Sequence, residues 1–241
     1  MRIRTSTVTC ALLCALAIAA CGSSSSSSAS HTSVAAATAA PGGGSSKSDT
    51  SAGTSTAAAS GSSSSAPVIG FEGVPLEQGP LLAPASTTRD RPVDGISCDT
   101  REQLVYHIHS HLAVFYDGRL FAIPAGVGIP GAVQQQTPVG TIVGSGICLF
   151  WLHTHTTDGV IHIESPTRRI YTLGEFFDIW RQPLSSHRIA GLHGTVTAFV
   201  NGRPWKRSPR DIPLLPHEDI QLEIGEPAPP IVTVDWARTQ L

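Results

Sequence analysis

The stretch Leu152-His-Thr-His-Thr-Thr-Asp-Gly-Val-Ile-His-Ile-Glu164 decides the predicted fold. Its Asp158-Gly159 pair stands between two alternating runs, which is a strong signal for a β-hairpin with a two-residue turn. In that register His155 lies opposite His162, and His153 lies opposite Glu164. Side chains alternate along a strand with a period of two, so these four polar residues share one face. The other face then carries the residues expected in a core, which are Phe150, Leu152, Ile161 and Ile163.

A second run, Tyr106-His-Ile-His-Ser-His-Leu-Ala-Val114, repeats this alternation, with its three histidines on one face and its apolar residues on the other. Neutral imidazole is the commonest metal ligand, and a site needs three or four ligands from different directions. We therefore predict a site for Zn²⁺ or Cu²⁺, provided that the strand and the hairpin are neighbours and that the turn has two residues rather than three. The candidate ligands are His107, His109, His111, His153, His155, His162 and Glu164.

The first 66 residues indicate a signal for export followed by a flexible linker. Two arginines, an apolar run and the tetrapeptide Ile18-Ala-Ala-Cys21 are typical of a lipoprotein signal peptide over residues 1–20, with lipid attached to Cys21. Residues 21–66 are rich in Ser, Ala, Gly and Thr, a composition typical of a disordered linker. We expect a protein anchored to the cell membrane through lipid, with its domain on the extracytoplasmic face.

The net charge of the chain limits the kinds of partner it can bind, and its cysteines indicate the compartment. Loss of Arg2 and Arg4 with the signal peptide would leave 14 basic and 18 acidic side chains, a formal charge of −4. Without a basic stripe, this balance argues against nucleic acid as a partner, while protein partners are left open. The domain keeps Cys98 and Cys148, an even pair in an oxidising compartment, so we predict a disulfide. The alternative makes both thiols metal ligands beside the histidines.

Residues 67–241 have the size of one domain, and β-structure dominates the pattern. Asp117-Gly118 and Asn201-Gly202 are two further hairpin signals. Alternation predicts a strand over residues 219–224 with its isoleucines and leucine inward, and residues 231–234 are a candidate last strand. Residues 67–100 are rich in Pro and Gly and are expected to wrap around the domain, and residues 124–146 to form a long loop with one short strand near residues 141–143.

One helix is well signalled. Thr172 and Glu175 have the spacing of a capping box, and Pro183 is expected to end the helix. The apolar stripe at helical spacing consists of Leu173, Phe176, Phe177 and Trp180. The predicted class is therefore α+β, predominantly antiparallel β with one amphipathic helix packed on the sheet.

Four motifs together resemble a family of secreted or membrane-anchored bacterial and archaeal proteins. They are His107-Ile-His-Ser-His-Leu, Trp151-Leu-His-Thr-His, Gly159-Val-Ile-His-Ile-Glu-Ser-Pro and Tyr171-Thr-Leu-Gly-Glu-Phe-Phe-Asp-Ile-Trp180. The resemblance covers roughly residues 98–225 and implies that the histidine strands and the helix form one module. It implies no particular reaction.

Three functions fit these residues. The first is an extracytoplasmic metal-binding domain; a thioether site for Cu⁺ is disfavoured because Met1 is the single methionine of the chain. The second is a metal-dependent hydrolase or hydratase in which the ion activates water and Glu164 acts as ligand or general base. The third is a structural or interaction module whose histidines lie on a solvated face. His187 and His217 fall outside the proposed face, and His193 is undecided.

Overall fold

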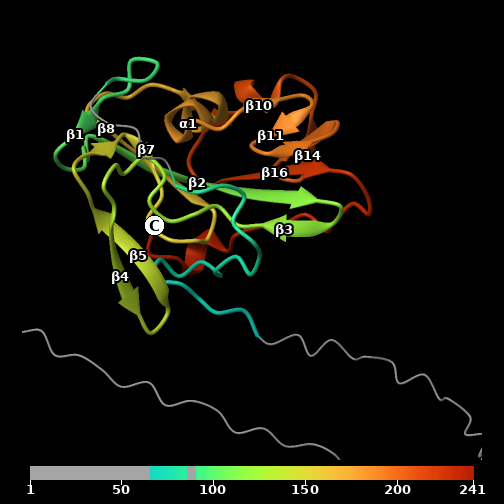
Figure 1. Cartoon of the computed structure of the whole chain (residues 1–241), viewed down its shortest axis with the longest axis horizontal. Helices are drawn as coiled ribbons and strands as arrows, with labels where there is room; N and C mark the ends of the chain where they lie inside the picture. The colour runs from blue at the N-terminus through green and yellow to red at the C-terminus, as the bar shows by residue number, and fades with distance from the viewer. Residues whose placement is uncertain (1–65, 86–90) are drawn as a thin grey trace, which may run out of the picture. The chain divides into compact units, whose positions relative to one another are not determined.

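The computed structural model describes residues 66–85 and 91–241 (Figure 1). The predicted signal peptide, Cys21 and nearly all of the predicted linker lie outside the described residues. Within the described part of the chain, no helix is long and apolar enough to cross a membrane.

A seven-stranded sheet forms the centre of the domain, in the order β14-β13-β16-β2-β8-β7 with β3 also paired to β2. Its strands are β2 (Tyr106–Tyr116), β3 (Arg119–Phe121), β7 (Leu152–His153), β8 (Val160–Ser165), β13 (Val196–Val200), β14 (Arg203–Trp205) and β16 (Glu218–Ile224). The β2–β16 pair is parallel and all the others are antiparallel. A mainly antiparallel β domain with a single α-helix is therefore confirmed for the described residues.

The shorter strands pair at the margins of this sheet. They are β1 (Cys98–Asp99) with β6 (Leu149–Phe150), β4 (Val133–Thr137) with β5 (Gly140–Ser145), β9 (Tyr171–Thr172) with β15 (Pro213–Leu214), and β10 (Leu184–Ser185), β11 (Arg188–Ile189) and β12 (Leu192–His193) together. Short 3₁₀-helices are η1 (Pro209–Asp211) and η2 (Trp236–Arg238). The short strand expected near residues 141–143 is present as β5, but the rest of residues 124–146 is not only a loop, because the polar run of β4 pairs with β5 as a hairpin.

Two of the three predicted hairpin turns are confirmed. Tyr116 pairs with Arg119 and Val200 with Arg203, which leaves two residues in each turn. The φ angles are 48° and 71° in the first turn and 49° and 72° in the second. Positive φ at both central positions defines the type I′ turn, which Asp-Gly and Asn-Gly favour.

The third turn was predicted in the wrong register. His153 pairs with His162 instead of Glu164, and residues 154–159 form a longer connection between β7 and β8. Gly159 is needed there for another reason: its φ is 77°, and a Cβ atom would lie 2.5 Å from the carbonyl oxygen of Leu112 on β2. The register differs from the prediction by two residues, an even number, so the strand residues His153, His162 and Glu164 keep their predicted face.

One face of the sheet is apolar and lies in the core with the helix. Phe150, Leu152, Ile161 and Ile163 are at most 1% exposed, and they belong to the same cluster as the predicted helical stripe. The helix α1 (Leu173–Trp180) begins with the predicted capping box and ends at Arg181 in the left-handed conformation, before Pro183 is reached. Figure 1 shows α1 and β10 on one side of the sheet.

The opposite face is polar, and two chain segments cover it. The segment from residue 66 to 85 has little regular structure, as predicted, and the C-terminal segment is joined to it by a hydrogen bond from the Gln240 amide to the Glu72 carbonyl. The amide of Val232 donates to the side chain of Gln221 on β16, and that of Val234 to Asp219. Residues 231–234 therefore run over the face of β16 and do not form the expected strand.

The predicted disulfide between Cys98 and Cys148 is present, and it joins the segments that carry β1 and β6. The alternative, in which both thiols act as metal ligands, is therefore wrong. The bridge holds the segment directly before β7, the strand that carries the first histidine of the hairpin.

Candidate metal centre

The histidine strand and the histidine hairpin are neighbours in the sheet. On β2 and β8, His107 lies opposite Glu164 and His109 lies opposite His162, while β7 adds His153 on the other side of His162. Directly opposite residues project from the same face of a sheet. Their face is buried: His109, His153, His162 and Glu164 are between 0% and 6% exposed. The reading of these histidines as decoration of a solvated face therefore does not hold.

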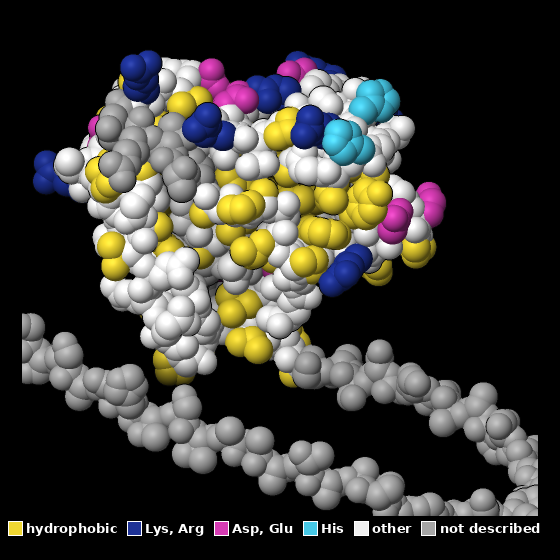
Figure 2. Space-filling view, in the orientation of Figure 1, with side chains coloured by type: hydrophobic (Ala, Val, Ile, Leu, Met, Phe, Trp, Pro, Cys, Tyr) yellow, Lys and Arg dark blue, Asp and Glu magenta, His cyan; other side chains and the backbone are white. Residues whose placement is uncertain are grey.

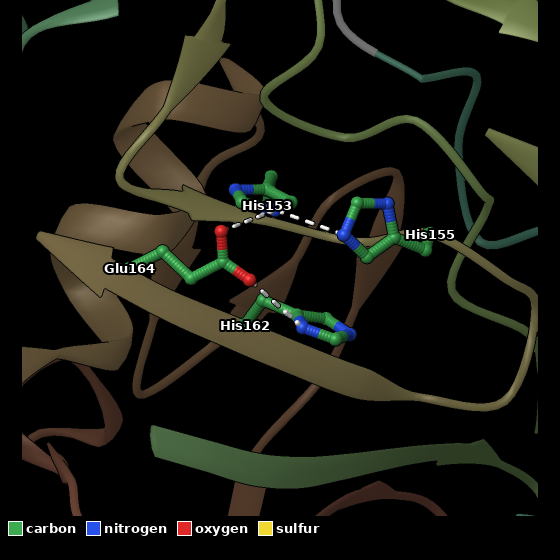
Figure 3. Close-up of side chains that lie close together, drawn as sticks. All are labelled: His153, His155, His162 and Glu164. Atoms are coloured by element: carbon green, nitrogen blue, oxygen red, sulfur yellow. Dashed lines mark hydrogen bonds and ion pairs between the residues drawn. The ribbon is translucent and has the colours of Figure 1, made fainter. Parts of the chain in front are cut away.

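Three of these side chains and His155, from the connection between β7 and β8, form what we call the inner cluster, which consists of His153, His155, His162 and Glu164 (Figure 3). One ligand atom from each lies within 4.8 Å of the others. The Nε2 atoms of His153 and His155 are 3.1 Å apart, and the Oε2 atom of Glu164 is 3.8 Å from Nε2 of His153. These residues could hold a metal ion.

Backbone carbonyls fix the tautomers of the first two imidazoles. Nδ1 of His153 lies 2.7 Å from the Phe150 carbonyl oxygen, and Nδ1 of His155 lies 2.6 Å from that of Val143. A carbonyl oxygen only accepts, so each Nδ1 must carry the proton and donate it. In the neutral rings, both Nε2 atoms then present a lone pair to each other. This is the arrangement that outer hydrogen bonds give to metal-binding imidazoles.

Neither of the two Nε2 atoms is protonated, so no hydrogen bond forms between them. Burial, followed by the neighbouring imidazoles of His155 and His162, holds the pKa of His153 well below its ordinary value. Burial, together with His162, also lowers the pKa of His155. Both rings are therefore neutral near pH 7, and neither can donate to the other through Nε2. A cation between the two atoms would turn this repulsion into attraction.

His162 differs from the other two imidazoles because its ring is bonded to a carboxylate, that of Glu72, and not to a backbone carbonyl. Its Nε2 lies 3.0 Å from Oε1 of Glu72. Its Nδ1 is buried 3.5 Å from Oε1 of Glu164 and has no hydrogen-bond partner in the described part of the chain. Burial lowers the pKa of His162, but the nearby carboxylates of Glu164 and Glu72 outweigh burial and raise it to about 9. In the metal-free domain this ring is an imidazolium between two carboxylates. When it loses one proton, Nε2 can still donate to Glu72 and Nδ1 becomes free to bind an ion.

The spacing of the inner cluster suits a tetrahedral ion. With metal–ligand bonds of about 2.0–2.1 Å, the ligand atoms of a tetrahedral site lie roughly 3.3 Å apart. Three contacts in the cluster measure 3.1, 3.5 and 3.8 Å, and all four ligand atoms lie within 4.8 Å of one another. The side chains therefore have to draw together somewhat to close around a metal.

A second group, which we call the outer cluster, consists of His107, His109 and His162. Nε2 of His107 is 3.2 Å from Oε1 of Glu164, and the rings of His107 and His109 lie edge to face with centroids 4.6 Å apart. Nε2 of His109 is buried without a hydrogen-bond partner. Burial and the neighbouring His162 and His107 lower the pKa of His109 to about 2, so this ring is neutral.

His111, the remaining predicted ligand, belongs to neither cluster. It is 3% exposed and lines another pocket, among mostly apolar residues such as Val74 and Ala113. His111 shares a face of β2 with His109, but it lies two residues further along the strand. There it pairs with Val160 instead of a histidine. His187, His193 and His217 are exposed, and Figure 2 shows histidine side chains at the surface of one face.

Sequence reasoning missed two acidic neighbours of the cluster. Glu72, 5% exposed, reaches His162 from the irregular N-terminal segment, and Glu102 places Oε1 3.7 Å from Nε2 of His155. Neither lies in an alternating run. The one available signal for Glu72 is that it is the single acidic residue between residues 67 and 76 of a segment expected to wrap the domain.

A pocket of about 230 Å³ opens beside the clusters and is lined by the side chains of Glu72, His107, His109, His155, His162 and Glu164, among others. His107 stands at its mouth with 38% of its side chain exposed, while His153 is 1% exposed. Comparison of the chain with protein-family models, with curated proteins and with solved structures gives no match.

Proposed function

We propose that this domain binds a divalent transition-metal ion through His153, His155, His162 and Glu164. The observation that carries the proposal is the contact of 3.1 Å between two Nε2 atoms whose Nδ1 atoms both donate to backbone carbonyls. A buried polar atom without a partner costs stability, and two lone pairs face to face cost more. A metal ion is the partner that both atoms accept.

The charges of the cluster support a cation of charge +2. Glu72 and Glu164 are both buried and lie 3.0 and 3.5 Å from the two nitrogens of His162. Burying unpaired carboxylates is expensive, so the site requires compensating positive charge. In the metal-free protein His162 supplies one unit. A divalent ion bound to neutral His162 balances both carboxylates.

The ligand set favours Zn²⁺ or Cu²⁺. Three imidazoles and one carboxylate suit these ions, and the arrangement of four protein ligands around a small space suits the tetrahedral preference of Zn²⁺. The disulfide keeps Cys98 and Cys148 from contributing thiolates. Glu72 then acts as the outer carboxylate that orients His162, a role that usually accompanies metal-binding histidines.

Metal content tests the proposal. Protein purified without an affinity tag and exposed to Zn²⁺ or Cu²⁺ should retain at least one equivalent through gel filtration, measured by elemental analysis. Retention close to zero after attempted loading would defeat the proposal and would favour a structural or interaction module.

We further propose that the domain works outside the cytoplasm, held to the membrane by lipid on Cys21. The disulfide supports an oxidising compartment, where such bonds persist. Cys21→Ala should move the protein from the detergent-rich to the aqueous phase on detergent partitioning, or leave it unprocessed. Equal membrane fractions for the two forms would reject the lipid anchor.

A metal-dependent hydrolase or hydratase is the second candidate. The observation that favours it is the pocket beside the cluster, which gives a small molecule access to metal-binding side chains.

A further inference from the structure

We propose that the outer cluster holds a second divalent cation, bound by His107, His109 and Glu164, so that Glu164 bridges two ions. This proposal rests on the proposed function, because the bridge requires an ion in the inner cluster. It assigns to the domain a two-metal centre with a buried inner ion and an accessible outer ion.

The position of the Glu164 carboxylate is the first argument. Its Oε1 atom is 3.2 Å from Nε2 of His107, whereas its Oε2 atom is 3.8 Å from Nε2 of His153. Oε1 also lies 3.5 Å from Nδ1 of His162, which belongs to both clusters. One oxygen of this buried carboxylate thus faces His107 of the outer cluster, while the other faces His153 of the inner cluster. In two-metal sites the ions lie about 3.5–4 Å apart, a separation that a bridging carboxylate can span.

The second argument is the unpartnered nitrogen of His109. The side chain is 6% exposed, and its Nε2 atom lacks a hydrogen-bond partner within residues 66–85 and 91–241. Its ring lies edge to face against both His107 and His162, with centroids 4.6 Å from each. Buried polar atoms in native proteins are rarely left unsatisfied without a functional reason. His107 and His109 offer ligand atoms within 4.8 Å of each other, so a cation bound by His107 would supply the missing partner.

The number of ligands argues against a single ion that uses every histidine. The inner cluster already offers four side chains, which completes a tetrahedral site. His107 and His109 then have no place around that ion, yet they share Glu164 with it. An ion held by His107, His109 and Glu164 has three protein ligands, and the pocket of about 230 Å³ lies in front of it. Three ligands with an open position are typical of catalytic sites.

The net charge around the outer ion predicts which ligand takes its open coordination position. Glu72 and Glu164 balance the inner ion, so the outer ion adds positive charge that Glu102, near His155, offsets only in part. The outer ion is therefore expected to bind more weakly than the inner one. It should also prefer an oxygen anion as its remaining ligand, either hydroxide or the carboxylate of a small molecule. Water activation by this centre would take place at the outer ion.

The test is a count of metal ions in the full chain and in matched variants. Zn²⁺ titration followed by calorimetry and elemental analysis should show two equivalents in the unmodified protein, with the second binding more weakly than the first. His109→Ala should bind one equivalent with unchanged affinity. His107→Ala should also bind one equivalent. This variant is expected to fold, because it removes a side chain that is partly exposed. His187→Ala, on an exposed histidine, should keep both equivalents.

Copper gives a second readout. At two equivalents of Cu²⁺, bridging by Glu164 should couple the two ions and diminish the electron paramagnetic resonance signal relative to one equivalent. A single equivalent in the unmodified protein, with an affinity that falls in His109→Ala, would overturn the second site and leave the inner site intact. Binding of no ion by any form would overturn both proposals.

Discussion

Replacing His153 with alanine is expected to lower the affinity of the domain for Zn²⁺ by more than about 100-fold, since loss of an outer hydrogen-bond partner alone usually costs 10–100-fold. His153 is fully buried, and among the residues that the structure describes its Nε2 atom faces Nε2 of His155 and the Glu164 carboxylate. His155→Ala should have an effect of the same order. Competition titration against a chelator of known affinity measures the change.

His187→Ala is the matched control, because it removes an exposed imidazole and should leave the affinity unchanged. Thermal unfolding in a chelator checks that the His153→Ala variant is folded before its affinity is compared. Equal affinities for Zn²⁺ in His153→Ala, His155→Ala and His187→Ala would remove the inner cluster as the binding site.

The affinity for Zn²⁺ should fall about tenfold for each pH unit below 9, or about 100-fold between pH 8 and pH 6, because one proton must leave His162. The pKa of His162 is raised to about 9 by Glu72 and Glu164 against the effect of burial, whereas the pKa values of His153 and His155 are lowered. Competition therefore comes from His162 and begins well above the ordinary histidine value of 6.5. Titrations in metal-buffered solutions from pH 6 to pH 9 measure the slope.

The stability of the metal-free domain should have the opposite pH dependence. A pKa raised on folding contributes stability that is complete below about 6.5 and is lost as the pH rises toward 9. Glu72→Gln is the control, because its amide oxygen still accepts from Nε2 while the charge that raises the pKa is gone. This variant should show a weaker pH dependence between pH 7 and pH 9. An affinity that is the same at pH 6 and pH 8 would contradict the assignment of His162.

Period-two alternation predicted which face of each strand carries the histidines, and it did so despite a wrong register. The Asp158-Gly159 signal suggested a two-residue turn, but Gly159 serves the close approach of the backbone to Leu112. The error of two residues left His153 and His162 on the same face. An error of one residue would have separated them. The face was therefore predictable from local pattern, whereas the pairing was not.

Adjacency of the two histidine elements depends on contacts that are distant in sequence. The parallel pairing of β2 with β16 and the antiparallel pairing of β2 with β8 follow from how the whole apolar face is buried against α1 and its neighbours. His155 lies in the 154–159 connection and is held by Val143 of β5, a strand that the sequence indicated only in part. Its place in the inner cluster could not be derived from strand alternation.

Glu72 shows most clearly what a sequence pattern leaves out. It lies 90 residues before His162 in a segment without periodicity, and it reaches the site because that segment covers the polar face of the sheet. Conversely, His111 satisfies the pattern on β2 but lies beyond the clusters. Alternation assigns a side chain to a face, while its position along the strand relative to neighbours decides whether it can be a ligand.

The most direct measurement is anomalous X-ray diffraction from crystals of the protein loaded with Zn²⁺, collected on both sides of the zinc absorption edge. The inner site predicts an anomalous peak between His153 and His155, about 2.0–2.1 Å from both Nε2 atoms, with His162 and Glu164 completing the coordination. A peak confined to exposed histidines such as His187, with the two Nε2 atoms still in contact at 3.1 Å, would contradict it.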